Sequence, residues 1–194
     1  MPEAQLLEEI SAGDPAAFEH VVRAHGPRML SVARRILRNE DDARDCLQDA
    51  FIQAYRAIGK FEGRSSLGSW LHRIVVNAAL MKLRRRKSKP EQSIEDLMPT
   101  FDAENCRVEP MWQIEESVEA MIGRREVRDM VLASIDKLPE SYRTVLLLRD
   151  IEEYTTTEVA ETLGINTGAV KVRLHRARAA LKKLLEPVFE QVGE

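Results

Sequence analysis

The fold is decided by one stretch near the C-terminus, TTTEVAETLGINTGAVKVRLHRARAA (residues 155–180). Thr155 and Glu158 have the S/T-x-x-E spacing of a capping box, which marks the start of a helix. Gly164 follows where a turn is needed, since glycine adopts a positive φ at little cost. The apolar residues have the spacing of two short helices packed together: Val159, Leu163, Ile165 and Val170. The stretch therefore predicts a helix-turn-helix.

The second helix of this motif is basic on one side. Asn166 or Thr167 can cap it, and Lys171, Arg176 and Arg178 point away from its apolar side. Such a helix fits the DNA major groove, where arginine can bond guanine and basic side chains neutralise phosphates. An amphipathic helix with a solvated basic face is the alternative, and the motif alone does not say which kind of DNA-binding protein this is.

Charge is unevenly distributed along the 194 residues, whose formal net charge is −3. Residues 1–90 hold 16 basic and 11 acidic residues, residues 91–126 hold 3 and 10, and residues 127–194 hold 10 and 11. Two stretches contain seven and six basic residues and no acidic one: Arg73–Lys89 and Lys171–Lys183. Basic stretches on both sides of an acidic middle indicate a nucleic-acid partner.

Several classes of protein are not indicated. No apolar run approaches the roughly 20 residues of a transmembrane helix, and the N-terminus lacks the apolar core of a signal peptide. Cys46 and Cys106 are far apart and lack CxxC spacing, which argues against a disulfide framework or a zinc site. We find no catalytic set of residues and no glycine-rich phosphate loop. We therefore expect a soluble, cytosolic protein that is not an enzyme and uses no cofactor or metal.

The spacing of apolar residues predicts an all-α chain. We expect two small helical domains, residues 1–90 and 127–194, joined by a flexible acidic linker, residues 91–126. In the first domain, Asp14-Pro15 starts a helix that Gly26-Pro27 breaks. The remaining predicted helices begin after Pro27, at Asn39, at Leu67, near Ser117, at Glu140, at Thr155 and at Thr167.

The predicted helix from Leu67 to Arg86 carries a second basic feature. Arg73, Asn77 and Arg84 are spaced i, i+4 and i+11, so they share one side of the helix. Guanidinium and amide groups in such a row suit a nucleic-acid backbone and exposed bases. A solvated basic helix end accounts for the same residues equally well.

Two longer stretches carry a resemblance: DARDCLQDAFIQAYRAIGKFEGRSSLGSWLHRIVVNAALMKLRRR (42–86) and LPESYRTVLLLRDIEEYTTTEVAETLGINTGAVKVRLHRARAALKKL (138–184). With both in this order, the chain resembles the extracytoplasmic-function (ECF) sigma factors of the bacterial sigma-70 family. The resemblance implies that it binds core RNA polymerase and directs promoter-specific initiation. Its other implied partners are promoter DNA and an anti-sigma factor, and no membrane insertion is expected.

The resemblance also assigns residues to each task. In the family, the helix that here begins at Asn39 docks on the clamp coiled coil of the polymerase, and the matching polar residues are Asp45, Gln48, Asp49 and Gln53. A solvated acidic face is the alternative. The −10 element would be melted and held as a single strand by a loop and the helix that follows it: Phe61, Gly63, Arg64, Ser65, Ser66, Trp70, Arg73, Asn77, Arg84 and Arg85. For Trp70, a wedge between bases and a place in the core are both open.

The −35 element would be recognised as duplex by the last helix: Thr167, Lys171, Val172, Arg173, His175, Arg176 and Arg178. Val172 departs from the small polar residue expected there, and His175 from an aromatic or variable one, so the promoter sequence does not transfer from the family. A stand-alone helix-turn-helix regulator and a protein that sequesters a partner are the rival functions. We also hypothesise that the acidic linker shields the basic surfaces by mimicking DNA.

Overall fold

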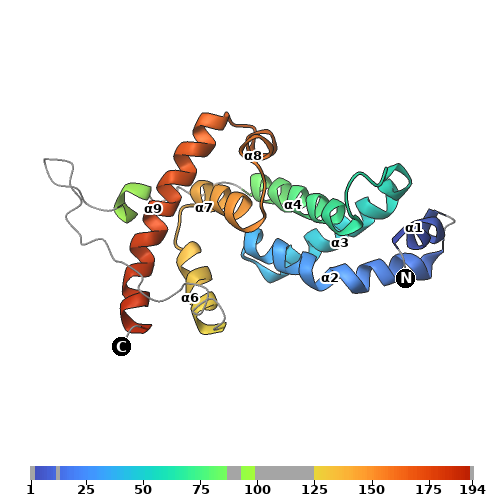
Figure 1. The fold of residues 1–194 in the computed structure, drawn as a ribbon, viewed down its shortest axis with the longest axis horizontal. Coiled ribbons are helices and arrows are strands. Elements are labelled where there is room, and N and C mark those ends of the chain that lie inside the picture. The colour runs from blue at the N-terminus through green and yellow to red at the C-terminus, as the bar shows by residue number, and fades with distance from the viewer. Residues whose placement is uncertain (1–2, 12–13, 87–92, 99–124, 193–194) are drawn as a thin grey trace, which may run out of the picture. The chain divides into compact units, whose positions relative to one another are not determined.

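The computed structural model describes residues 3–11, 14–86, 93–98 and 125–192, and every regular element within these ranges is helical (Figure 1). The chain divides into two compact units, Met1–Ser88 and Lys89–Glu194. The predicted all-α class is therefore confirmed. None of the described helices is long and apolar enough to cross a membrane.

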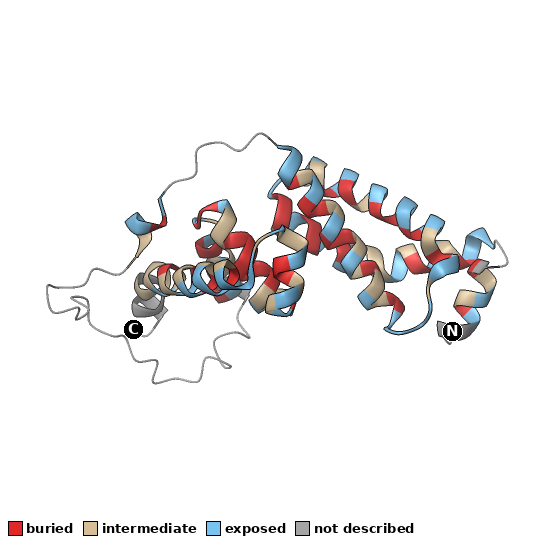
Figure 2. Ribbon diagram, turned by 90° about the horizontal axis from the view of Figure 1, so that it is seen from above, coloured by how far each residue is buried: buried red, intermediate tan, exposed pale blue. Residues whose placement is uncertain are grey.

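The N-terminal unit is built from α1 (Glu3–Ser11), α2 (Pro15–Leu37), α3 (Glu40–Ala57) and α4 (Leu67–Arg85), with a short 3₁₀ turn η1 (Ile58–Lys60) after α3. Helices α2, α3 and α4 pack on one another pairwise. Buried residues form stripes along the helices in Figure 2, as amphipathic helices around a shared core require. The largest fully buried side chains of this core are Met29, Leu37, Leu67 and Leu71.

Helix α2 continues through Pro27, so the predicted break at Gly26-Pro27 is wrong. An internal proline costs a helix about 3 kcal/mol, because it removes one backbone donor and crowds the preceding turn. Burial on both sides of the proline opposes that cost, since Val21 is 1% and Met29 0% exposed. The helix ends instead at Arg38, whose φ of 54° places it in the left-handed region.

Side-chain caps fix where these helices begin. Asp14 accepts a hydrogen bond from the backbone N–H of Ala16, and Asn39 accepts one from that of Asp42. Ser66 caps α4 by accepting from the backbone N–H of Ser69 at 3.2 Å. The first two caps confirm the predicted helix starts, and all three satisfy backbone donors that the first helical turn leaves unpaired.

The C-terminal unit contains α6 (Arg125–Ile135), α7 (Glu140–Leu146), a π-helical turn η3 (Leu147–Ile151), α8 (Thr156–Leu163) and α9 (Thr167–Val192). Helices α6, α7 and α8 all pack on α9. The capping box of Thr155 and Glu158 is formed, and Gly164 adopts a φ of 67° in the turn. These features confirm the predicted helix-turn-helix of α8 and α9.

One part of the predicted linker is structured. Ser93 caps a 3₁₀ turn, η2 (Ile94–Leu97), which packs on α9. Ile94 is only 2% exposed, and Lys183 Nζ donates to the backbone carbonyl of Met98 at 3.1 Å. Within residues 93–98 the linker is therefore bound to the C-terminal unit rather than free, because an apolar side chain is removed from water there. Cys106 and most of the predicted linker lie outside the described residues.

Candidate nucleic-acid and protein interfaces

Helix α9 separates a buried side from an exposed one. Val170 and Ala177 are fully buried and Leu174 is 9% exposed, and α7 and α8 pack on this helix. The opposite side carries residues that are exposed over the first three turns: Thr167, Gly168, Lys171, Val172 and His175. Asn166 caps the helix by accepting from the backbone N–H of Ala169 at 2.7 Å. The N-terminal half of α9 therefore offers a fixed, accessible surface for a DNA groove.

Three further residues predicted to contact the −35 element lie beside this surface. Arg173 is partly exposed. Arg176 Nη1 lies 2.8 Å from Glu95 Oε1, and hydrogen bonding to Tyr142 and the charge of Glu95 raise the pKa of Arg176. The Glu95 carboxyl is itself held by Ser93 and then by Arg176, which lowers its pKa. Glu95 belongs to the predicted acidic linker. It thus forms an ion pair with an arginine that the resemblance assigns to DNA binding.

Arg178 also has a partner within the fold. Its Nε and Nη2 donate to the two carboxylate oxygens of Asp150 at 2.9 and 2.6 Å, and this bonding raises the pKa of Arg178. Asp150 belongs to η3, so the paired fork fastens α9 to the π-helical turn. Arg178 therefore helps to position α9 through Asp150.

The loop predicted to hold a flipped base lies between η1 and α4. The rings of Phe61 and Trp70 pack with centroids 5.3 Å apart, and both side chains are partly buried. Gly63 has a φ of 69°, where a residue with a Cβ would be strained. Arg64 pairs with Glu62 at 2.6 Å, while Ser65 and the cap Ser66 are exposed. The loop thus combines a partly buried aromatic pair with exposed polar residues.

Helix α4 presents the predicted row of polar residues to solvent. Arg73, Asn77, Arg84 and Arg85 are all exposed, and their i, i+4 and i+11 spacing places the first three on one side. Met81, four residues after Asn77, is 51% exposed on the same side. The face therefore combines cations, an amide and one apolar side chain, a combination suited to an unpaired strand.

The predicted polymerase-binding residues share the outer side of α3, where all four are exposed: Asp45, Gln48, Asp49 and Gln53. A groove of about 620 Å³ between α2 and α3 adjoins them and includes Gln48 in its wall. Its apolar lining includes Phe18, Ile52 and Tyr55, and the Phe18 and Tyr55 rings meet edge-on at 5.0 Å. Ile52 and Tyr55 are 43% and 48% exposed.

Sequence reasoning missed this groove. Its one available signal was that Ile52 and Tyr55 are large apolar residues outside the buried stripe of α3. Such residues, when clustered and exposed, mark sites for other molecules. Phe18 gave no separate signal, because it fits the apolar side of its own helix.

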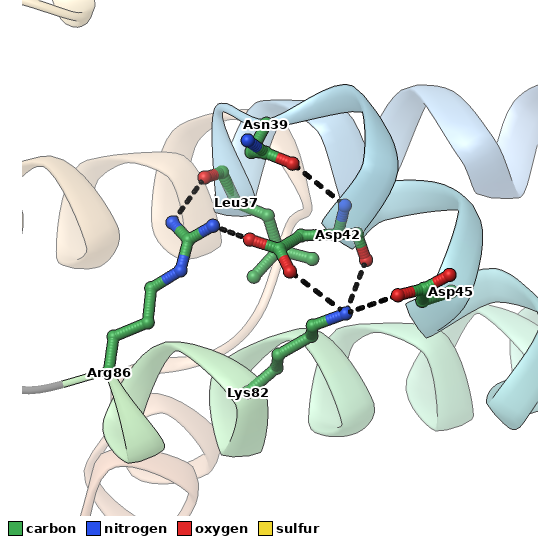
Figure 3. Close-up of polar contacts among 6 residues, drawn as sticks. All are labelled: Leu37, Asn39, Asp42, Asp45, Lys82 and Arg86. Atoms are coloured by element: carbon green, nitrogen blue, oxygen red, sulfur yellow. Dashed lines mark hydrogen bonds and ion pairs between the residues drawn. The ribbon is translucent and has the colours of Figure 1, made fainter.

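A polar cluster fixes α3 against α4 beside this surface (Figure 3). Asp42 accepts from Lys82 Nζ at 3.0 Å and also pairs with Arg86. Arg86 Nη1 donates to the carbonyl of Leu37 at 3.0 Å, which satisfies the C-terminal end of α2. Lys82 also reaches Asp45 at 3.4 Å, so one predicted polymerase-binding residue is tied to α4. The Asp42 carboxylate thus links α3 to Lys82 and Arg86, and Arg86 extends the cluster to the end of α2.

In the part of the chain that the structure describes, no group of three or more His, Cys, Asp or Glu residues could hold a metal ion. Cys46 is buried, and this burial raises the pKa of its thiol to about 11.

Comparison with known proteins gives matches in both units. Residues 21–89 match the family Sigma-70 region 2, and residues 128–181 match the family Sigma-70, region 4. The chain is 34% identical to RNA polymerase sigma-H factor of Pseudomonas aeruginosa, covering 96% of this chain and 95% of that protein. It is 37% identical to ECF RNA polymerase sigma factor SigM of Mycobacterium tuberculosis, covering 94% and 84%. A solved structure of CnrH in complex with the cytosolic domain of CnrY matches with 26% identity and a TM-score of 0.53, covering 95% and 97%.

Proposed function

The chain belongs to the ECF group of RNA polymerase sigma factors, which direct transcription initiation, and from this premise we propose that its two units bind promoter DNA in two different states. The C-terminal unit binds the −35 element as duplex. The N-terminal unit docks on core RNA polymerase and melts and holds the −10 element as a single strand. A sigma factor is not an enzyme, so the polymerase supplies the chemistry.

The observation that carries the proposal is the exposed side of α9. Lys171, Val172 and His175 lie opposite the buried Val170 and Ala177, at the start of the second helix of a helix-turn-helix. In this motif the N-terminal residues of the second helix contact base edges in the major groove. Lysine and arginine there add phosphate contacts, which give a salt-dependent affinity.

The single-strand role is supported by the loop before α4 and by the face of α4. Phe61 and Trp70 form an aromatic pair, and Gly63 in the same loop leaves the backbone open to a close approach. An extruded base needs stacking and hydrogen bonds to offset an unstacking cost of a few kcal/mol. Arg73 and Asn77 are then in place along α4 for the strand that follows.

Docking on polymerase is supported by the acidic side of α3. Asp45 and Asp49 would steer a basic coiled coil and set its register, because exposed opposite charges act mainly on orientation and association rate. The adjoining groove adds apolar area at Ile52 and Tyr55. Aromatic side chains such as Tyr55, once a partner covers them, provide much of the binding energy in many interfaces.

A regulatory protein is the third proposed partner. The solved structure of CnrH is a complex with the cytosolic domain of CnrY, and this chain resembles CnrH over 95% of its length. We expect an anti-sigma factor to cover the α3 surface and its groove. Such a partner would compete with core polymerase for the same residues.

The test is transcription by purified core polymerase on a library of genomic fragments from the source organism, with and without this chain. Discrete RNA 5′ ends that arise only when the chain is added are the expected result. If no such starts arise but the chain alone binds specific duplexes tightly, it is a stand-alone helix-turn-helix regulator. If neither starts nor DNA binding are seen, it is a protein that sequesters a partner.

A further inference from the structure

The exposed side of α9 carries an apolar row beside His175, and basic residues lie along both edges of that side. Gly168, Val172 and Ala179 follow one another at i, i+4 and i+11, so they share one side of the helix. Val172 is 57% exposed, which makes it the most exposed of the large apolar side chains in the described residues. Lys171 and Arg176 lie on either side of this row.

Neither packing nor helix formation accounts for Val172. A side chain that is more than half exposed contributes little to the core, whose nearby members are Val170 and Leu174. Valine also favours helix less than alanine, lysine or arginine, because its branched Cβ restricts the first side-chain torsion. An apolar residue at this place is therefore better explained by what the helix binds.

Small residues one turn before and two turns after Val172 leave room beside it for a groove floor, while His175 is a larger neighbour on the same side. Gly168 has no side chain, and Ala179 has only a methyl group. Val172 is the sixth residue of α9, within the half of the second helix that meets base edges. The only apolar group that a base pair presents in the major groove is the C5 methyl of thymine.

We propose that Val172 selects a thymine in the −35 element by packing on its C5 methyl group. The inference rests on the proposed function, since it assigns a base preference to the same duplex-binding helix. Arg176 and Lys171 would provide the polar and phosphate contacts on either side. The thymine can lie on either strand, because both strands expose their methyl groups in the major groove.

The experiment starts with the holoenzyme formed from core polymerase and the full chain. The holoenzyme selects bound duplexes from a library randomised across the −35 region. Each thymine of the selected element is then replaced by uracil, which removes only the methyl group. At one thymine we expect affinity to fall about fourfold, the effect of about one methyl group returned to water.

Two variants assign that loss to Val172. Val172→Thr keeps one methyl group on Cβ and should retain part of the preference for thymine over uracil. Val172→Ser removes both methyl groups and should bind thymine and uracil duplexes equally. Because residue 172 is exposed, the melting temperatures of both variants should stay close to that of the parent chain.

The outcomes separate the inference from the function on which it rests. If uracil is tolerated at every thymine, or if Val172→Ser keeps the full preference, the inference is wrong while the sigma function stands. If Val172→Ser weakens binding of the regulatory protein and leaves the thymine preference intact, Val172 serves a protein interface instead. If the holoenzyme selects no element at all, the proposed −35 function fails and the inference fails with it.

Discussion

Glu95 of the acidic linker and Arg176 of α9, the helix proposed to bind the −35 element, form an ion pair at 2.8 Å. The partners are 81 residues apart in sequence, and buried Ile94 holds the acidic segment on α9. An anion that binds this arginine competes with DNA for it. This ion pair is one specific contact by which the acidic linker could shield the basic side of α9, as the hypothesis requires.

Glu95→Gln should raise the affinity of the free chain for duplex DNA about two- to fivefold, the range expected for one exposed ion pair. The substitution removes the charge that competes for Arg176 while keeping the side chain's size. Fluorescence anisotropy at low and physiological salt measures the change, and the gain should shrink as salt screens the pair.

The matched control is Asp96→Asn, which removes the same charge from the next residue, also exposed. An equal gain in both variants would mean that net charge alone is responsible. The specific contact would then have no role in DNA binding.

Asp42→Asn should lower the free energy of unfolding of the N-terminal unit by about 1 to 2 kcal/mol, because two cations lose their shared carboxylate. Asp41→Asn is the control, since it lies in the same first turn of α3 and feels the same helix dipole. In a Trp112→Phe background, Trp70 fluorescence during urea unfolding reports on this unit. Equal losses in the two variants would leave the cluster of Figure 3 without a stabilising role.

Much of the fold follows from local sequence rules. Asp14, Asn39 and the Thr155–Glu158 pair begin helices as predicted, because each cap depends only on residues within one turn. The failure at Gly26-Pro27 has the opposite origin. Long-range burial beside Pro27 outweighs a local preference, and a single sequence does not give the size of that burial.

Which candidate residues share one exposed side of a helix was predictable, but the surfaces that several helices form together were not. The exposed row on α4 and the basic side of α9 follow from helical spacing alone. The groove beside α3 requires the packing of α2 against α3, which brings Phe18 to Tyr55. The pairing of Glu95 with Arg176 could not be predicted either, since the two residues are 81 positions apart in the sequence.

Cys46 should make the N-terminal unit less stable in alkaline solution. Burial, with a smaller contribution from Asp49 and an opposing one from Lys82, raises the thiol pKa from 9.0 to about 11. Between these pH values the unfolded chain loses a proton from this thiol that the folded chain keeps. The free energy of unfolding is therefore at its full value below about pH 9 and falls as the pH rises toward 11.

The measurement is urea unfolding of the parent chain and of Cys46→Ala at about pH 8 and pH 10.5. The parent should lose about 1 to 2 kcal/mol more than the variant over this interval, since tyrosines and lysines titrate in both. Parallel pH profiles would show that the Cys46 thiol does not couple to folding.

The most direct measurement of the central claim compares Asn77→Ala with Arg176→Ala in two assays on a promoter found by the transcription experiment. One assay scores permanganate-reactive thymines in the −10 region of the holoenzyme complex, and the other scores binding of the full chain to a −35 duplex. We predict that Asn77→Ala lowers opening about tenfold and spares duplex binding, while Arg176→Ala lowers duplex binding about tenfold, the range for one lost base contact. Equal losses from each variant in both assays would contradict the assignment of single strand to α4 and duplex to α9.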